Sequence, residues 1–250
     1  MAVVLYRGLG AEIVRKFAAQ GSNIAINYVN NEGPAQKLAQ ELRSSYNVNI
    51  AVVQADASST DQVQSCVRTA ISALGGLDIV IANAGWTRFA DFADLDALSD
   101  EEWNKCWRMH VLGIKHLVSS SMPTFKANPE GGVVLVTSSI AGRNLNGSSL
   151  AYSVTKAAQL HLVKCVAKTQ GAKLRANAVL PGLLLTEWGQ QFGKERIEVL
   201  QKEAVLKQEV CHQLVLCNWQ EKYYSTNSSF LFLDKYPRLR RYVCISCQEY

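Results

Sequence analysis

The chain has 250 residues, of which 48% are hydrophobic and 19% charged. A chain of this size and composition buries a core without disulfides or a structural metal, which excludes a mini-protein and a disordered chain. The net charge of +5 is too diffuse to indicate nucleic acid binding, although it weakly favours an anionic ligand. No apolar run reaches the roughly 20 residues of a membrane span, and Arg7 interrupts the apolar start, so we expect a cytoplasmic protein.

Helical and strand patterns alternate along most of the chain. A helical pattern begins near residue 11 and ends at Gly21, and a short apolar strand follows at 24–26. Further strands are predicted at 49–54, 77–82, 132–137 and 174–179, and helices near 34–45, 59–74, 99–127 and 150–170. The strands are short and apolar throughout, as strands buried on both faces are. The pattern predicts a single α/β domain with a doubly wound, Rossmann-like parallel sheet.

Functional residues are expected just after the strands, because ligands of such folds bind beyond the carboxyl ends of the strands. The first candidate is the turn before the first helix, where Arg7 precedes Gly8 and Gly10. Glycines there allow a backbone to approach a pyrophosphate at a helix N-terminus. Two glycines are an incomplete fingerprint, so an ordinary turn stays an alternative.

A second candidate opens the helix after the fifth predicted strand. Tyr152 and Lys156 are four residues apart and lie on one helical face, so the ammonium stabilises the phenolate. This makes the tyrosine a usable acid or base near neutral pH. Ser139 lies thirteen residues before the tyrosine, just past a strand end, where its hydroxyl faces a ligand.

With three further motifs, this set resembles the short-chain dehydrogenase/reductase family. Asn83-Ala84-Gly85, Ser139, Tyr152 with Lys156, and the segment 177–182 (Asn-Ala-Val-Leu-Pro-Gly) occur in the order and spacing of that family. The resemblance runs from about Arg7 to about Gln208. Within the family, the chain looks most similar to NADP-linked reductases of the 3-oxoacyl-carrier-protein reductase type.

The resemblance implies a Ser-Tyr-Lys catalytic set and a hydride transfer between NADP(H) and a carbonyl or alcohol. Tyr152 would exchange a proton with the substrate oxygen, and Ser139 would orient that oxygen. Lys156 would lower the pKa of the tyrosine and bind the nicotinamide ribose. A helix lysine and a core aromatic are the structural alternative.

The same resemblance implies a row of cofactor-binding positions. Asn83 and Gly85 would flank the adenine ribose, and Asp56 would bind the adenine amino group. Gly8 and Gly10 would approach the phosphates, and Thr186, after Pro181 and Gly182, would bind the nicotinamide carboxamide. Each is also a common turn or capping residue type, which is the alternative for each.

The choice between NADP and NAD depends on the end of the second family strand. NAD enzymes place an acidic residue there, about 20 positions after the glycine turn, whereas this chain has no carboxylate in residues 27–31. Arg7 is a candidate partner for a 2′-phosphate, or else a surface arginine. We therefore expect NADP rather than NAD.

The chain departs from the family at three places. The first strand is nearly absent, and Val3 and Val4 stand where the glycine motif begins. His110 replaces an asparagine that in the family holds a water linking the lysine to solvent; the histidine either preserves this relay or merely packs on its helix. Beyond Gln208 the closing strand of the family is not recognisable.

The last departure predicts a domain over 1–208 and an atypical tail over 209–250, compatible with disorder, without the last strand of the sheet. All 16 glycines lie at or before Gly193. A basic run is formed by Lys235, Arg238, Arg240 and Arg241, and it indicates a solvated tail rather than a nucleic-acid-binding segment. A CxxC pair is formed by Cys244 and Cys247, but one such pair is too weak a signal to indicate a metal site. A catalytically impaired relative with weak cofactor binding is the alternative function.

The sequence predicts the substrate and the partners only by chemical class. A small carbonyl or alcohol is the expected substrate, with no nucleic acid, membrane or metal. A homodimer through the helices at 99–127 and 150–170 is compatible with the family pattern. Substrate determinants are expected in two segments, residues 86–89 and 186–207, where Trp188 and Phe192 are candidates for an apolar lid.

Overall fold

The computed structural model describes residues 8–184, 186, 189–203 and 242–246. Its strands are all parallel and lie in the order β2-β1-β6-β3-β4-β5. They are β1 (Asn23–Tyr28), β2 (Ile50–Gln54), β3 (Ile79–Ala82), β4 (Gly132–Thr137), β5 (Leu174–Val179) and β6 (Tyr242–Ser246). The doubly wound parallel sheet predicted from the sequence is confirmed.

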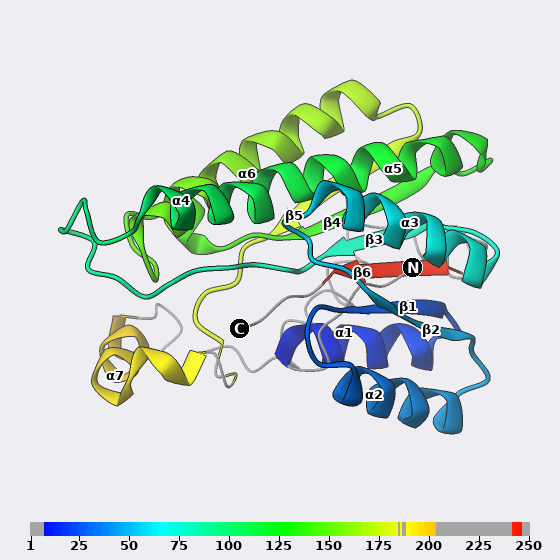
Figure 1. Ribbon diagram of the computed structural model, residues 1–250, viewed down its shortest axis with the longest axis horizontal. Coiled ribbons are helices and arrows are strands. Elements are labelled where there is room, and N and C mark those ends of the chain that lie inside the picture. The colour runs from blue at the N-terminus through cyan, green and yellow to red at the C-terminus, as the bar shows by residue number, and fades with distance from the viewer. Residues whose placement is uncertain (1–7, 185, 187–188, 204–241, 247–250) are drawn as a thin grey trace.

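Helices cover both faces of this sheet (Figure 1). One face carries α1 (Gly8–Ala19) and α2 (Glu32–Ser45), and the other carries α3 (Thr60–Leu74), α5 (Gly113–Ala127) and α6 (Leu150–Gln170). The remaining helices are α4 (Asp100–Trp107), the 3-10 turns η2 (Ile140–Gly142) and η3 (Gly189–Phe192), and α7 (Lys194–Glu203). None of the helices in these ranges combines the length and apolarity needed to cross a bilayer.

The core is split by the sheet into two layers. Ile79 and Ile81 of β3 belong to the cluster beneath α1 and α2, whereas Val80 and Ala82 belong to the cluster beneath α3 and α5. All four side chains of β3 are buried. Alternate residues of one strand therefore fill opposite layers, which explains why the strands are apolar without a polar face.

The centre of the sheet differs from the expectation. No strand was predicted in residues 209–250, whereas Tyr242–Ser246 form β6. β6 does not extend the far edge, where β5 is the outer strand of the described sheet, but lies between β1 and β3. Val243 pairs with Ile24 on one side and with Ile79 on the other. A five-residue strand carries little pattern of its own, so the free backbone edges of β1 and β3 decide its position. The domain boundary at residue 208 stays a prediction.

The long helix predicted over 99–127 is interrupted. Residues Arg108–Leu112 form a π-turn, η1, in which the Gly113 N–H donates to the Arg108 carbonyl five residues earlier. The turn lets the adjacent residues Met109 and His110 both point into the core. His110 in this wide turn also forms hydrogen bonds to other elements. The hydrophobic pattern of the sequence carries no information on such contacts, so it did not predict the turn.

Candidate active site

The candidate site lies where β3, β4 and β5 end and α6 begins. Ser139 follows β4, and Tyr152 and Lys156 lie in the first two turns of α6. Ser149 caps this helix, because its Oγ accepts a hydrogen bond from the Tyr152 N–H at 3.3 Å. The Tyr152 backbone is therefore held at the helix N-terminus, beside the strand end that carries Ser139.

Ser139 and Tyr152 are joined by their side chains. Ser139 Oγ accepts from the Ala141 N–H at 3.1 Å, so its own hydrogen is free to turn toward another oxygen. Burial raises the pKa of Tyr152 to about 12, and the hydrogen bond with Ser139 acts in the opposite direction. The phenol is therefore protonated at neutral pH and able to donate.

Lys156 is almost fully buried, with 2% of its surface exposed. Its Nζ donates to the Thr137 carbonyl at 2.9 Å and to Gln159 Oε1 at 3.3 Å. The same Nζ lies 5.5 Å from the centre of the Tyr152 ring. Burial lowers the pKa of Lys156 to about 7, so the ammonium titrates near neutral pH.

His110 connects three elements around this pair. Its Nε2 accepts from the Trp86 N–H at 3.0 Å, which leaves the proton on Nδ1 to be donated to Thr155 Oγ1 at 2.8 Å. The Thr155 hydroxyl donates in turn to the Ala151 carbonyl at 2.7 Å. Burial lowers the pKa of His110 well below its usual range, so the ring is neutral. It packs edge to face on Tyr152, with ring centres 5.4 Å apart.

Both nitrogens of the His110 ring are thus engaged in hydrogen bonds that hold the loop after β3 and the helix α6. The proton relay through His110 stays a prediction. These contacts favour the packing alternative that the sequence left open.

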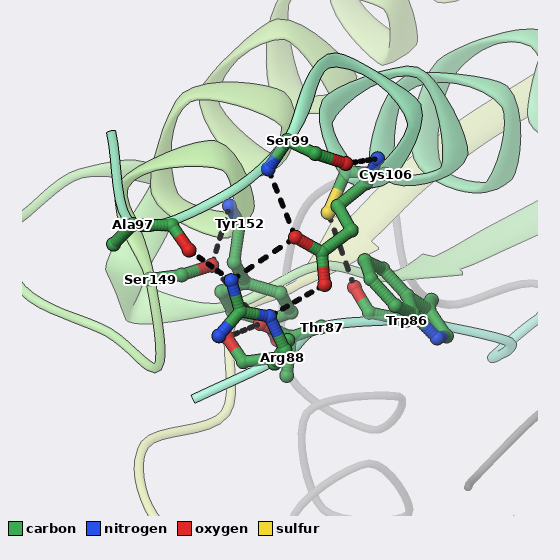
Figure 2. Close-up of polar contacts among 9 residues, drawn as sticks. Trp86, Thr87, Arg88, Ala97, Ser99, Cys106, Ser149 and Tyr152 are labelled. Atoms are coloured by element: carbon green, nitrogen blue, oxygen red, sulfur yellow. Dashed lines mark hydrogen bonds and ion pairs between the residues drawn. The ribbon is translucent and has the colours of Figure 1, made fainter. Parts of the chain in front are cut away.

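Figure 2 shows how the loop after β3 is fastened. The Trp86 carbonyl accepts from the buried Cys106 thiol at 3.6 Å. Thr87 Oγ1 lies 3.1 Å from Ser149 Oγ and accepts from Ser148 Oγ at 2.7 Å. The loop is therefore tied both to α4 and to the start of α6.

Of the four loop residues expected to shape the substrate site, three are engaged in packing or in an ion pair within the loop region. Trp86 and Thr87 are buried in packing, and Arg88 points to α4, where it pairs with Glu102 and donates to the Ala97 carbonyl. Phe89 instead meets Phe192 edge to face, with ring centres 4.8 Å apart. Trp188, the other candidate for an apolar lid, lies outside the described residues.

The predicted phosphate and adenine positions lie at the ends of several strands and helices. Gly8 begins α1 with a positive φ of 59°, a conformation that favours glycine, and Gly10 is buried in the same turn. Asp56 follows β2, and its Oδ1 accepts from the N–H and hydroxyl of Ser58, both at 2.8 Å. These bonds make Asp56 a turn residue, one of the alternatives that the sequence left open, whereas the N-cap of α3 is Ser59. Arg7 lies outside the described residues.

The positions predicted for the adenine ribose and for the nicotinamide lie after β3 and after β5. Asn83 and Gly85 follow β3 directly, and the Pro181 carbonyl, after β5, accepts from the Ile140 N–H at 3.0 Å. Gly182 also approaches Ile140, since a Cβ there would lie 3.5 Å from its Cδ1. Thr186 Oγ1 accepts from the Gly189 N–H at 3.0 Å and so caps η3.

The residues around Lys156 fit a nicotinamide nucleotide. Two of the three ammonium hydrogens are used by Thr137 and Gln159, which leaves the third for a ribose hydroxyl. A side chain at Gly85 would fill the adjoining space, because its Cβ would lie 3.5 Å from His110 Nε2 and 3.8 Å from Lys156 Nζ. The glycine therefore keeps the head of the lysine open.

Comparison with known proteins identifies the chain. The family model described as enoyl-(acyl carrier protein) reductase matches residues 3–215. A putative ketoacyl reductase of the granaticin polyketide synthase of Streptomyces violaceoruber is 33% identical over 183 residues, which are 73% of this chain and 71% of that protein. The chain belongs to the short-chain dehydrogenase/reductase family. As a member of it, the chain is an NAD(P)-dependent oxidoreductase.

Solved structures support the fold of this short-chain dehydrogenase/reductase. A family member from Burkholderia xenovorans superposes with a TM-score of 0.80 and 20% identity, over 98% of this chain and 95% of the other. L-sorbose reductase from Gluconobacter frateurii, solved with NADPH and L-sorbose, gives 0.78 and 22%, over 98% and 97%.

Several residues of the site were missed in the sequence. Thr155 and Gln159 lie on α6 three and seven residues after Tyr152, on the face that also carries Lys156. Both are buried, and both hydrogen-bond to His110. The signal that would have found them is a run of polar residues on a helical face that otherwise packs against the core.

Proposed function

We propose that this chain is a carbonyl reductase that uses NADPH, or the corresponding alcohol dehydrogenase in reverse. The observation that carries the proposal is the convergence of three groups: the Ser139 hydroxyl, the Tyr152 phenol and the buried Lys156 ammonium. A hydrogen-bond donor, an acid and a cation side by side are the groups that a carbonyl oxygen needs as negative charge develops on it.

Each residue has a distinct role in the reduction. Bound NADPH supplies the hydride. Ser139 donates a hydrogen bond to the carbonyl oxygen, with its own lone pair held by the Ala141 N–H. Tyr152 donates the proton to that oxygen, and the Lys156 ammonium stabilises the phenolate that remains. In the reverse direction the phenolate accepts the proton from an alcohol.

NADP is proposed over NAD from the end of β1. Tyr28 ends this strand, and Asn27 donates its amide hydrogens to backbone carbonyls, including those of Val53 and Ala55. The first carboxylate beyond the strand is Glu32, which begins α2 and accepts from Gln36 at 2.9 Å. Calorimetric titration with both cofactors tests the preference; we expect a lower Kd for NADPH, and an equal or lower Kd for NADH contradicts it.

The substrate is proposed to be a small ketone or a 3-oxoacyl thioester. The name of the granaticin relative and the family description support the thioester. The experiment is NADPH oxidation with a panel of ketones and 3-oxoacyl thioesters, using wild type and Tyr152→Phe. A wild-type rate no higher than that of the variant across the panel overturns the proposal. The alternative, a catalytically impaired member of the family with weak cofactor binding, then takes its place.

A homodimer through α4, α5 and α6 remains part of this proposal. Trp107, Leu112 and Val154 lie on or next to these helices with 43%, 38% and 46% of their surface exposed, which supports an apolar contact. Sedimentation of wild type and Trp107→Glu tests it, with a monomeric variant expected. The cytoplasmic location also stays a prediction.

A further inference from the structure

Gln159 is a buried polar residue to which neither the sequence motifs nor the proposed reaction assigns a role. Its side chain is completely buried on α6, three residues after Lys156. Gln159 Oε1 accepts from Lys156 Nζ at 3.3 Å, and Nε2 donates to the His110 carbonyl at 3.0 Å. A buried amide is costly unless it is hydrogen-bonded, and both ends of this one are.

The partner of Nε2 belongs to the π-turn. An i→i+5 turn shifts the hydrogen-bond pattern of a helix and leaves a carbonyl to be satisfied from outside. Gln159 fills this need at His110, while the His110 ring is held separately by Trp86 and Thr155. The amide of Gln159 is therefore anchored to η1, and it does not follow the movement of the lysine.

The anchored Gln159 amide restricts the orientation of the Lys156 ammonium. An ammonium on a four-carbon stem is mobile unless its hydrogens are fixed. Thr137 of β4 accepts one hydrogen and Gln159 of α6 accepts the second. Because the three hydrogens are arranged tetrahedrally, fixing two of them also fixes the direction of the third, and Gly85 adjoins the ammonium without a side chain, where a Cβ would lie 3.8 Å from Nζ.

We propose that Gln159 is a positioning residue that holds the Lys156 ammonium in its charged form and aims it at the ligand side of the site. The proposal deepens the function proposed above and rests on it for the reaction, but not for the state of the lysine. The titratable groups facing Lys156 are Tyr152 on α6, His110 on η1 and Cys106 on α4.

Two substitutions of opposite effect test the proposal. Gln159→Met keeps the length of the side chain and removes the acceptor, so the ammonium loses stabilisation and the pKa of Lys156 falls. Gln159→Glu places a carboxylate at the same position, so the pKa of Lys156 rises. The matched control is Gln170→Met, a glutamine at the C-terminal end of the same helix.

The first readout does not require activity. NMR titration of the lysine side-chain nitrogens in the full chain without cofactor follows Lys156, which is assigned by its absence in Lys156→Met. Shifts of opposite sign in the two Gln159 variants, with none in Gln170→Met, support the proposal. An unchanged titration in whichever Gln159 variant folds overturns it, even if the chain proves to have no reductase activity.

The second readout is the pH profile of NADPH oxidation. If the ammonium is the active form, Gln159→Met lowers kcat by about tenfold at pH 8 and about twofold at pH 6, the ratio expected for a tenfold change in acidity. Gln159→Glu moves the alkaline limb to higher pH. A uniform loss of kcat at every pH contradicts positioning and indicates a structural role only.

Discussion

The two halves of the sheet are assembled in different ways. The proposed catalytic half, β3-β4-β5, is built from strands that follow one another in the chain, and Ser139, Tyr152 and Lys156 lie within 18 residues of sequence beside it. The other half, β2-β1, pairs in the same local manner. Neither half pairs with the other, because β6 from the far end of the chain lies between them.

This difference separates the parts of the site held by contacts between sequence neighbours from the parts that depend on contacts between distant segments. The proposed catalytic residues are held by neighbours in sequence, such as the Ser149 cap and the Ala141 N–H. The relation of the glycine turn at Gly8 to these residues depends on β6, since α1, which begins at Gly8, packs on β6 and β1, and β6 in turn pairs with β3. Chemistry and cofactor binding should therefore respond differently to changes at the two ends.

The largest expected effect is the loss of β6. Deleting residues 242–250 removes the strand that joins the sheet halves, so we expect loss of cooperative unfolding and of NADPH binding, measured by circular dichroism and calorimetry. The control is deletion of 247–250, which leaves β6 intact. Equal melting temperatures and NADPH affinities for the two deletions contradict a joining role for β6.

The catalytic half should be separable from binding. Tyr152→Phe removes the acid while keeping the ring that packs on His110. We expect kcat to fall by about 10²- to 10⁴-fold in NADPH oxidation, with NADPH affinity close to wild type. A variant that retains more than a tenth of wild-type kcat shows that another group donates the proton.

Loss of the His110 ring should weaken the link between the β3 loop and α6. His110→Leu leaves the Trp86 N–H buried without its acceptor, so we expect a loss of about 1–3 kcal/mol in the free energy of unfolding. Urea denaturation measures it, and Lys115→Leu, on the neighbouring helix α5, is the control. Stability equal to the control would show that the ring is dispensable for packing.

The pH dependence follows from Lys156. Its pKa falls from 10.5 to about 7 on folding, so between these values the unfolded chain binds more protons and the contribution of Lys156 to stability increases with pH. We expect the melting temperature of wild type to rise relative to Lys156→Met from pH 7 to 10. The reduction rate should fall over the same range as the ammonium is lost. If the melting temperatures of the two proteins change equally with pH, folding does not lower the pKa of Lys156, and the lysine lies in a solvated environment.

The smallest effect is expected at Arg88. Its ion pair with Glu102 lies at the surface, where solvent screens charges, so Arg88→Ala should change stability little. If the loop shapes the substrate site, KM for the ketone changes more than kcat. A fall in kcat as large as that of Tyr152→Phe would mean that the Arg88–Glu102 ion pair sets the position of Tyr152.

The sequence was sufficient for most of the local elements and for the spacing of the proposed catalytic residues. The strand at 132–137 and the helix at 150–170 were predicted with the bounds that the structure has, because buried strands and helices leave apolar patterns of different period. The spacing of Tyr152 and Lys156 likewise follows from the helix alone. Asp56 was also expected at the end of the strand that is β2, but only the structure shows its turn bonds with Ser58.

Tertiary structure alone decided three features: the central place of β6, the π-turn at 108–112 and the amide of Gln159 between Lys156 and His110. Each depends on contacts between segments distant in sequence, so no local period encodes it. A strand of five residues takes its position from the edges that it pairs with, and a buried amide takes its role from the two groups that it joins. The sequence determined which groups are available for the proposed chemistry, and the packing of distant segments determined how those groups are held.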